Sequence, residues 1–285
     1  MNWDSLVGFD DDHATPSTTA RARLPAIGIG TYGVEPAACA RAVETALEAG
    51  YRHVDTAEMY ENEAAVGRAI DSSAVDREDV FVATKVHSRH LAYGDVIEHA
   101  RASARRLGVD VIDLLYVHWP IRTYDPEETL AAFDELYDRG EIRHVGVSNF
   151  TPELLREAID VLDAPLFAHQ VECHPLLAQP ELRRLAREHD HTLVAYSPLA
   201  KGAVTDIPEL IAIADEHDVT PAQVALAWLR AKGAVPIPKS TTPAHVRENV
   251  AAVELELDAE AIERIDGIDR SERVVDFPRA PWNEP

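Results

Sequence analysis

Three apolar runs in the first half of the chain read YRHVD (residues 51–55), VFVATK (80–85) and IDLLYVH (112–118). Each run has the length and the β-branched and aromatic content of a buried strand. Each also ends in a polar side chain, namely Asp55, Lys85 or His118. Because the carboxyl ends of parallel neighbouring strands meet at one face of the fold, we expect these groups to gather there, together with Tyr60 from the segment after the first run.

Strand-like and helix-like segments alternate along almost the whole chain. The predicted strands cover residues 26–31, 51–55, 79–86, 111–118, 142–147, 166–172, 192–197 and 234–237, and the predicted helices cover residues 36–49, 63–70, 94–107, 126–139, 152–162, 180–189, 207–216, 221–231, 243–253 and 259–268. Strands that alternate with helices in this way, without a linker, predict an α/β chain of one domain, a (β/α)8 TIM barrel over residues 1–285. Within it, residues 1–25 form an N-terminal extension and residues 271–285 a C-terminal tail without a clear period.

A competing interpretation uses the glycines of GIGTYG, residues 28–33, which fit the dinucleotide-binding pattern G-x-G-x-x-G between a strand and a helix. Pro25 shortens that strand, however, and the predicted helix starts near Pro36, so its N-terminus lies outside the glycine turn. In this interpretation Asp55 would bind the ribose of the cofactor, and Tyr60, Lys85 and His118 would have no shared function. We therefore prefer the barrel, in which the glycines let the first strand approach its neighbours.

The composition is strongly acidic, with a formal net charge of -23 and a sequence pI of about 4.8. Such a field repels nucleic acid and anionic membranes, so neither is an expected partner. Only four of the 27 basic residues are lysine. The acidic excess indicates a protein from a high-salt cytoplasm, which means a halophilic source.

The sequence also indicates the cellular compartment. Cys39 and Cys173 lie far apart and form no redox or metal-binding spacing, which favours a reducing compartment. The first twenty residues carry neither a basic start nor an apolar stretch, and no window is long enough to span a bilayer. We therefore expect a cytoplasmic protein.

The polar strand ends suggest a carbonyl reductase on chemical grounds. A phenol such as Tyr60 can donate a proton to a carbonyl oxygen while a hydride attacks the carbon. The pKa of a free tyrosine is about 10, and a neighbouring ammonium can lower it by about 1–3 units. Lys85 is the expected ammonium, Asp55 the carboxylate that keeps it charged, and His118 the group that orients the carbonyl oxygen or relays a proton.

Two other functions remain open from the residues alone. Lysines at barrel strand ends also form Schiff bases, so Lys85 could serve a lyase or an aldolase-type enzyme if it lay in an apolar pocket. The barrel could also hold a nicotinamide cofactor as a redox sensor with little turnover. The carboxylate of Asp55 argues against the first function, and the complete set of four polar residues argues against the second.

The segment DTAEMYENE, residues 55–63, resembles the signature of the aldo-keto reductases. Further matches follow in family order: TK (84–85), VHW (117–119), GVSNF (146–150), HQVECHP (169–175), AYSPL (195–199) and IPKS (237–240). The resemblance implies a barrel without a Rossmann domain, a nicotinamide cofactor extended across the C-terminal mouth, and a small carbonyl or alcohol substrate. Its members include many monomers, so we expect a monomer or a weak oligomer.

The resemblance also implies which residues bind the cofactor. Ser148, Asn149 and Gln170 would bond the carboxamide, with Thr31 at the end of the first strand, and Tyr196 would stack on the nicotinamide. Ser197 and Leu199 would begin the loop over the pyrophosphate, Lys239 and Ser240 would meet the adenosine ribose, and Glu248 and Asn249 would lie toward the adenine.

The preference between the two nicotinamide cofactors depends on one departure from the family pattern. Many members place an arginine six residues after the lysine, where it grips the 2′-phosphate, and this chain has His245 there. Lys239 and Ser240 favour NADP(H), whereas a neutral imidazole is a poor substitute for a guanidinium. We expect NADP(H) to be preferred and NAD(H) to be usable, with a preference below about 100-fold, which is about 2.7 kcal/mol.

Tyr32, His87 and Trp119 are the expected walls of the substrate pocket, together with the tail that bears Trp282. These rings suit small aldehydes, ketones and keto sugars.

Four residues of the segment 169–174 are metal-ligand types: His169, Glu172, Cys173 and His174. On a strand they would alternate between faces and could not converge, so we expect no metal site.

Overall fold

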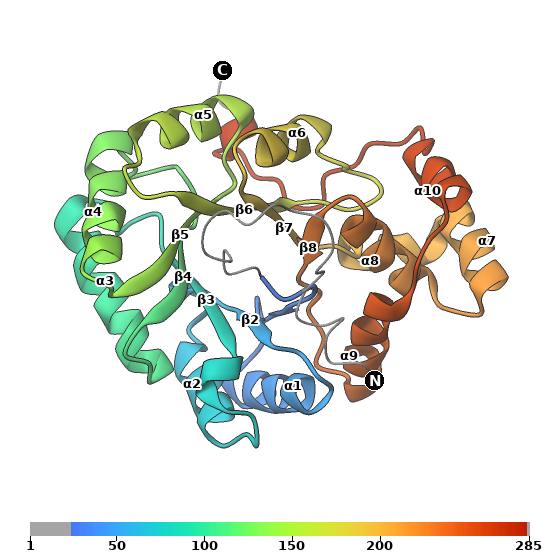
Figure 1. The fold of residues 1–285 in the computed structure, drawn as a ribbon, viewed down its shortest axis with the longest axis horizontal. Helices are drawn as coiled ribbons and strands as arrows, with labels where there is room; N and C mark the ends of the chain where they lie inside the picture. Colours follow the sequence, from blue (N-terminus) through green and yellow to red (C-terminus); the bar gives the residue numbers. More distant parts are fainter. Residues whose placement is uncertain (1–23, 284–285) are drawn as a thin grey trace, which may run out of the picture.

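The structure is a computed structural model that describes residues 24–283. Eight parallel strands follow one another around a single sheet in the order of the sequence. They are β1 (Ile29–Gly30), β2 (His53–Asp55), β3 (Phe81–Val86), β4 (Ile112–Val117), β5 (Ile142–Ser148), β6 (Leu166–Glu172), β7 (Thr192–Tyr196) and β8 (Ala234–Pro236). Figure 1 looks along the axis of this ring, with the helices outside it. The predicted (β/α)8 barrel is confirmed.

The first and last strands are joined by a backbone hydrogen-bond ladder that lacks some of its usual bonds. The amide of Gly28 donates to the carbonyl of Pro236 at 3.0 Å, and the amide of Gly30 donates to the carbonyl of Pro238 at 3.1 Å. The two prolines have no N–H to return, which explains why β1 is much shorter than the predicted strand over residues 26–31.

The glycines of the first strand allow close contact with neighbouring strands. A Cβ on Gly28 would lie 2.5 Å from Nδ1 of His53, and one on Gly30 would lie 2.9 Å from the carbonyl oxygen of Ile237. They therefore serve barrel closure, as expected, and the sheet order is that of a barrel.

The helices surround the strands at the predicted places. They are α1 (Pro36–Glu48), α2 (Glu63–Asp71), α3 (Tyr93–Leu107), α4 (Pro126–Asp138), α5 (Pro152–Val161), α6 (Pro180–Glu188), α7 (Pro208–His217), α8 (Pro221–Ala231), α9 (Pro243–Ala251) and α10 (Ala259–Asp266). Most begin with proline, whose fixed φ and missing N–H suit the first helical position. None of the helices within residues 24–283 is long and apolar enough to cross a bilayer.

The side chains inside the barrel recur at every second residue of a strand. Ala83 of β3, Leu114 of β4 and Ala168 of β6 belong to one buried cluster in the interior. Two or four residues further along the same face of these strands come Lys85, His118 and Gln170. The same alternation that fills the core therefore places polar groups at its C-terminal mouth.

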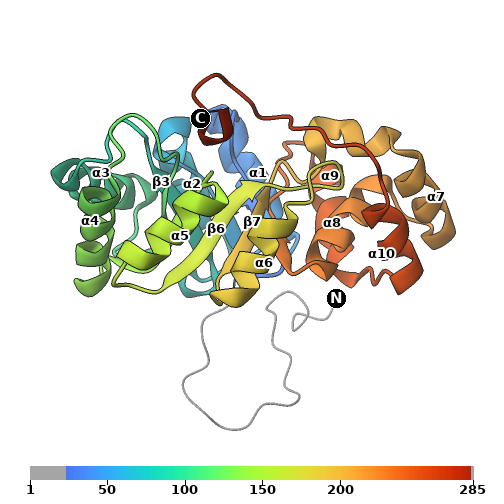
Figure 2. The same ribbon diagram turned by 90° about the horizontal axis from the view of Figure 1, so that it is seen from above.

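The two ends of the chain differ from the barrel. Leu24 is the first described residue and packs into the interior cluster, while the rest of the predicted N-terminal extension, up to residue 23, lies outside the described residues. After α10, the tail crosses one end of the barrel and finishes in a short 3-10 helix, η6 (Pro281–Asn283). Figure 2 shows this tail in dark red, running past β6 and β7.

Candidate active site

Asp55 and Lys85 form a buried ion pair at the ends of β2 and β3. The Lys85 ammonium donates to Oδ1 of Asp55, and it also donates to the carbonyl of Thr56 at 2.7 Å. Oδ2 of Asp55 accepts from Nε2 of Gln170 at 2.6 Å. Burial lowers the pKa of Lys85, and the Asp55 carboxylate opposes this change. The pair thus has the geometry that the sequence analysis expected.

Tyr60 stands beside this pair. It ends the 3-10 helix η2 (Glu58–Tyr60), which directly follows β2. The Lys85 ammonium lies 5.3 Å from the centre of the Tyr60 ring. The ring also makes edge contacts with His118 at 5.7 Å and with Tyr32 at 5.2 Å between ring centres. The four residues expected at the mouth are therefore brought together.

The expected effect of Lys85 on Tyr60 is wrong for this state of the protein. Burial, and after it the negative charge of Asp55, raises the pKa of the Tyr60 phenol well above its ordinary value. The main reason is the burial of the ring, which disfavours the charged phenolate, and the nearby Asp55 carboxylate adds to this effect. The phenol consequently keeps its proton at neutral pH, which is the form that a proton donor needs.

His118 provides a neutral imidazole opposite Tyr60. Burial, and after it the charge of Lys85, lowers the pKa of His118 well below its ordinary value. Its Nδ1 is buried and has no hydrogen-bond partner among the described residues. A neutral imidazole keeps one N–H that can orient a carbonyl oxygen by hydrogen bonding, and its other nitrogen can accept a proton.

The residues assigned to the carboxamide end of the cofactor surround the same mouth. Nδ2 of Asn149 donates to the carbonyl of His118 at 2.9 Å and to Oγ of Ser148 at 3.0 Å. Oδ1 of Asn149 accepts from the hydroxyl of Tyr196 at 2.8 Å. Thr31 lies close by and donates through Oγ1 to the carbonyl of Asp55. The backbone amide of Asn149 donates to the carbonyl of Gln170 at 3.0 Å, which joins this group to the residue whose side chain bonds Asp55.

The predicted pyrophosphate loop adopts unusual backbone angles. Ser197 has a φ of 47° and Lys201 a φ of 53°, both in the left-handed region. Leu199 precedes a 3-10 segment, η4 (Ala200–Asp206), that is kinked at Lys201 and Gly202. The chain therefore changes direction sharply directly after β7.

The residues assigned to the adenosine end form a separate group. They lie after β8 and on α9: Lys239 and His245 are exposed, Ser240 and Glu248 are partly buried, and Asn249 is buried. Glu248 accepts from the hydroxyl of Thr220 at 2.7 Å, so its carboxylate is already engaged. The structure thus brings the predicted cofactor residues into two groups, one at β5–β7 and one beyond β8.

The C-terminal tail contacts Trp119, one of the expected substrate residues. Trp119 packs against Phe277 at 4.8 Å and against Trp282 at 5.7 Å between ring centres. Tyr32 is largely exposed, and His87 follows β3. Phe277 was missed by the sequence analysis because the tail has no periodic pattern that would orient its side chains.

A buried glutamate fixes this tail, which the sequence analysis also missed. Oε1 of Glu172 accepts from the amide of Val274 at 2.6 Å, and Oε2 accepts from the amide of Val275 at 2.8 Å. The ammonium of Lys201 donates to the carbonyl of Val274 at 2.6 Å. The tail is therefore tied to both β6 and the cofactor loop.

The residues of metal-ligand type in the second half of β6 and directly after it do not form one group. Glu172 contacts Nε2 of His174 at 3.0 Å, whereas His169 packs against the rings of His191 and Phe150. Instead, among the described residues, the side chains that could share a cation are Glu58, His90 and His99. Three histidines between residues 87 and 99 were the available sequence signal.

Comparisons with known proteins agree with this geometry. A family model described as the aldo/keto reductase family matches residues 26–270. The chain is 39% identical over 261 residues to an aldo-keto reductase of Mycolicibacterium smegmatis, covering 90% of this chain and 94% of the relative. It is 37% identical to a 9,11-endoperoxide prostaglandin H2 reductase of Trypanosoma cruzi, covering 88% and 90%. The solved aldose reductase of Schistosoma japonicum has a TM-score of 0.87 and 28% identity, covering 91% and 93%.

Proposed function

The chain belongs to the aldo/keto reductase family and is an NAD(P)H-dependent carbonyl reductase, and from this premise we propose that Tyr60 is its general acid and base. The observation that carries the proposal is the contact of Tyr60 with both the Lys85–Asp55 pair and His118 at the C-terminal mouth. In TIM barrels this face holds the active site.

The side chains of the mouth divide the work of reduction. The neutral imidazole of His118 hydrogen-bonds the carbonyl oxygen and directs it toward Tyr60. The phenol of Tyr60 donates its proton to that oxygen as negative charge develops there. The charged Lys85 stabilises the resulting phenolate, and Asp55 holds the ammonium in place. In the reverse direction, Tyr60 accepts the proton of an alcohol.

The residues at the mouth fit a nicotinamide cofactor, which supplies or accepts the hydride when bound. Ser148, Asn149 and Gln170 offer amide and hydroxyl groups for a carboxamide, and they lie within one hydrogen-bonded edge next to Asp55. Hydrogen bonding of the Tyr196 hydroxyl to Asn149 fixes the ring of Tyr196, which suits stacking on a planar ring. Thr31 supports Asp55 from the opposite side.

NADP(H) is the proposed preferred cofactor, and NAD(H) a usable one. The exposed ammonium of Lys239, with Ser240 beside it, offers a charge for a 2′-phosphate. His245, also exposed, offers a weaker partner than an arginine would. Ser197 and Leu199 would cover the pyrophosphate, and Glu248 and Asn249 would face the adenine.

The proposed substrates are small aldehydes, ketones and keto sugars, and the rings of Tyr32, His87 and Trp119 with the tail support this class. The similarity to a solved aldose reductase, whose name denotes a sugar aldehyde as substrate, supports it as well. The acidic charge supports a halophilic source and argues against nucleic acid or membrane partners. The free cysteines Cys39 and Cys173 support a cytoplasmic location, and we propose a monomer or weak oligomer as in many family members.

The Schiff-base alternative has little support. Lys85 is 1% exposed, and its ammonium already donates to a carboxylate and to a backbone carbonyl. An amine in that position is charged and enclosed, whereas a Schiff-base lysine must be neutral and must reach the carbonyl carbon.

The proposal is tested by the variant Tyr60→Phe, which keeps the ring and removes the proton. We expect kcat with NADPH and a panel of aldehydes in molar salt to fall by about 10²–10⁴-fold. The dissociation constant for NADPH, followed by fluorescence, should stay the same. Tyr93→Phe, which removes a tyrosine hydroxyl at the start of α3 that bonds Glu135, is the control. Full activity of Tyr60→Phe would refute the assignment, and NADPH binding by the wild type without turnover of any carbonyl would favour the redox sensor.

A further inference from the structure

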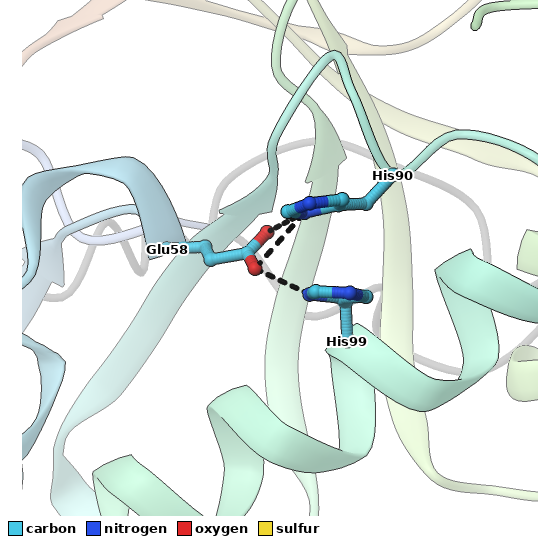
Figure 3. A group of neighbouring side chains, drawn as sticks. All are labelled: Glu58, His90 and His99. Atoms are coloured by element: carbon cyan, nitrogen blue, oxygen red, sulfur yellow. Dashed lines mark hydrogen bonds and ion pairs between the residues drawn. The ribbon is translucent and has the colours of Figure 1, made fainter.

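Glu58, His90 and His99 form a cluster at the rim of the barrel that the reductase reaction does not use. Glu58 begins η2, His90 lies in the loop after β3, and His99 lies on α3. Figure 3 shows the two imidazole rings side by side, each facing the same carboxylate. Their ring centres are 3.7 Å apart with 15° between the planes.

We propose that this cluster is a binding site for a divalent transition metal, with Zn²⁺ as the best fit. The ligands are Nδ1 of His90, Nδ1 of His99 and the carboxylate of Glu58, which all lie within 4.8 Å of one another. Two imidazoles and one carboxylate form a common zinc ligand set, and the fourth tetrahedral position is left to water. Mg²⁺ and Ca²⁺ prefer oxygen ligands and suit this site poorly.

The spacing of His90 and Glu58 matches that of two ligands on a tetrahedral ion. Zinc bonds of about 2.0–2.2 Å at tetrahedral angles place neighbouring ligand atoms about 3.3 Å apart. Nδ1 of His90 lies 3.2 Å from one oxygen of Glu58 and 3.3 Å from the other. Nδ1 of His99 contacts the first of these oxygens as well.

The surroundings hold the carboxylate in position and leave the site accessible. The amide of His87 donates to Oε2 of Glu58 at 3.0 Å, which is the kind of supporting contact that orients a metal ligand. The side chains of His90 and His99 are 33% and 29% exposed, so an ion can enter from solvent. The net charge of -23 raises the local concentration of cations.

The site has a structural consequence for the mouth of the barrel. Glu58 and Tyr60 belong to the same 3-10 helix, and His87 and His90 belong to the same loop. A metal ion would therefore connect η2, the loop after β3 and α3 in one rigid unit. We expect Zn²⁺ to raise the Tm of the wild-type protein.

The test measures metal binding directly, with the chelator-treated full chain. Equilibrium dialysis against Zn²⁺ should show one tightly bound ion, and Co²⁺ should give the intense visible absorption of a tetrahedral complex. The variants His99→Gln and Glu58→Gln should bind Zn²⁺ at least about 100-fold more weakly, as expected for loss of a metal contact. His189→Gln, which changes an exposed histidine at the end of α6, is the matched control and should bind as the wild type does.

His99 is half-buried on a helix surface, so its glutamine variant should keep the fold, which near-ultraviolet circular dichroism will confirm. The proposal is overturned if His99→Gln binds Zn²⁺ with the affinity of the wild type, or if the wild type binds no Zn²⁺ in the dialysis. It is also overturned if His189→Gln loses as much affinity as His99→Gln, because binding would then be spread over surface histidines.

Discussion

Asp55 and Lys85, thirty residues apart in the sequence, form a buried ion pair that joins the ends of two adjacent strands. Their side chains are 3% and 1% exposed. An ion pair at such a place is costly to break, because removal of one partner leaves a charge without compensation in a medium of low polarity.

The first prediction concerns the stability of this pair. We expect Asp55→Asn to lower the free energy of unfolding by about 3–5 kcal/mol, because Lys85 loses its partner. The double variant Asp55→Asn with Lys85→Met should lose less than the sum of the single variants. Urea denaturation in molar salt measures both quantities. Arg101→Gln breaks an exposed pair with Glu141 and should leave stability almost unchanged, and an equal loss in this control would contradict the prediction.

The second prediction concerns the tail. In Glu172→Gln, one of the two oxygens that accept from the Val274 and Val275 amides is replaced by an NH2 donor. The equilibrium constant for docking of the tail on the barrel should therefore fall by about 10–100-fold, as expected for loss of a hydrogen bond to a charged group. The KM for a carbonyl substrate should rise more than the KM for NADPH, and the fluorescence of Trp282 should change. Glu188→Gln on the surface of α6 is the control. An unchanged carbonyl KM would show that the tail needs no anchor.

The third prediction concerns cofactor choice. The ratio of kcat/KM for NADPH over NADH should lie below about 100 in the wild type, and His245→Arg should raise it by about 10–100-fold through a charge-assisted bond to the 2′-phosphate. Arg247→Gln, two positions further along α9, removes an exposed guanidinium and should leave the ratio unchanged. A wild-type ratio far above 100 would mean that another group already binds the phosphate.

The fourth prediction concerns pH and His191, which is buried without a side-chain partner among the described residues. Burial, followed by the charge of His189 and opposed by that of Asp190, lowers the pKa of His191 to about 4, and the ring of His169 packs against it. The unfolded chain, with an ordinary pKa of about 6.5, then binds more protons than the folded one below that value. Stability should therefore fall as the pH drops from 6.5 toward 4.

At pH 5 the part due to His191 is about 2 kcal/mol, since each pKa unit corresponds to about 1.4 kcal/mol. Replacement by asparagine removes the titrating group, so the slope of stability against pH should become shallower in His191→Asn. His217→Asn, an exposed histidine at the end of α7, should keep the slope of the wild type. The midpoints of urea denaturation, measured between pH 4.5 and 7, test this prediction. Identical slopes of stability against pH in the wild type, His191→Asn and His217→Asn would contradict it.

The fold could be predicted from the sequence because apolar strand-like runs alternate regularly with helix-like segments, most of which begin with proline. The strand over Leu166–Glu172 and the helix over Pro221–Ala231 have the predicted bounds. The first strand was predicted too long because its ladder depends on Pro236 and Pro238, which lie more than two hundred residues away. Such long-range pairing leaves no local pattern.

The candidate site could be predicted where the period of a strand orients the side chains, as for Lys85 and His118. The direction of the shift in the Tyr60 pKa could not be predicted, because it depends first on how deeply the ring is buried and then on the distance to the Asp55 carboxylate. The Glu58 cluster was missed for a similar reason. Its members come from three elements, and no spacing in the sequence relates Glu58 to His99.

Because Glu172 anchors the C-terminal segment, the catalytic residues and the outer wall of the mouth come from different parts of the chain. The strands fix the chemistry, while residues after α10 reach the mouth from outside the ring and add Phe277 and Trp282 to its wall. We therefore expect replacement of Phe277 or Trp282 to change which carbonyl compounds bind more than it changes the Asp55–Lys85 pair. The residues after α10 are therefore the first positions to vary when the substrate range of the enzyme is to be changed.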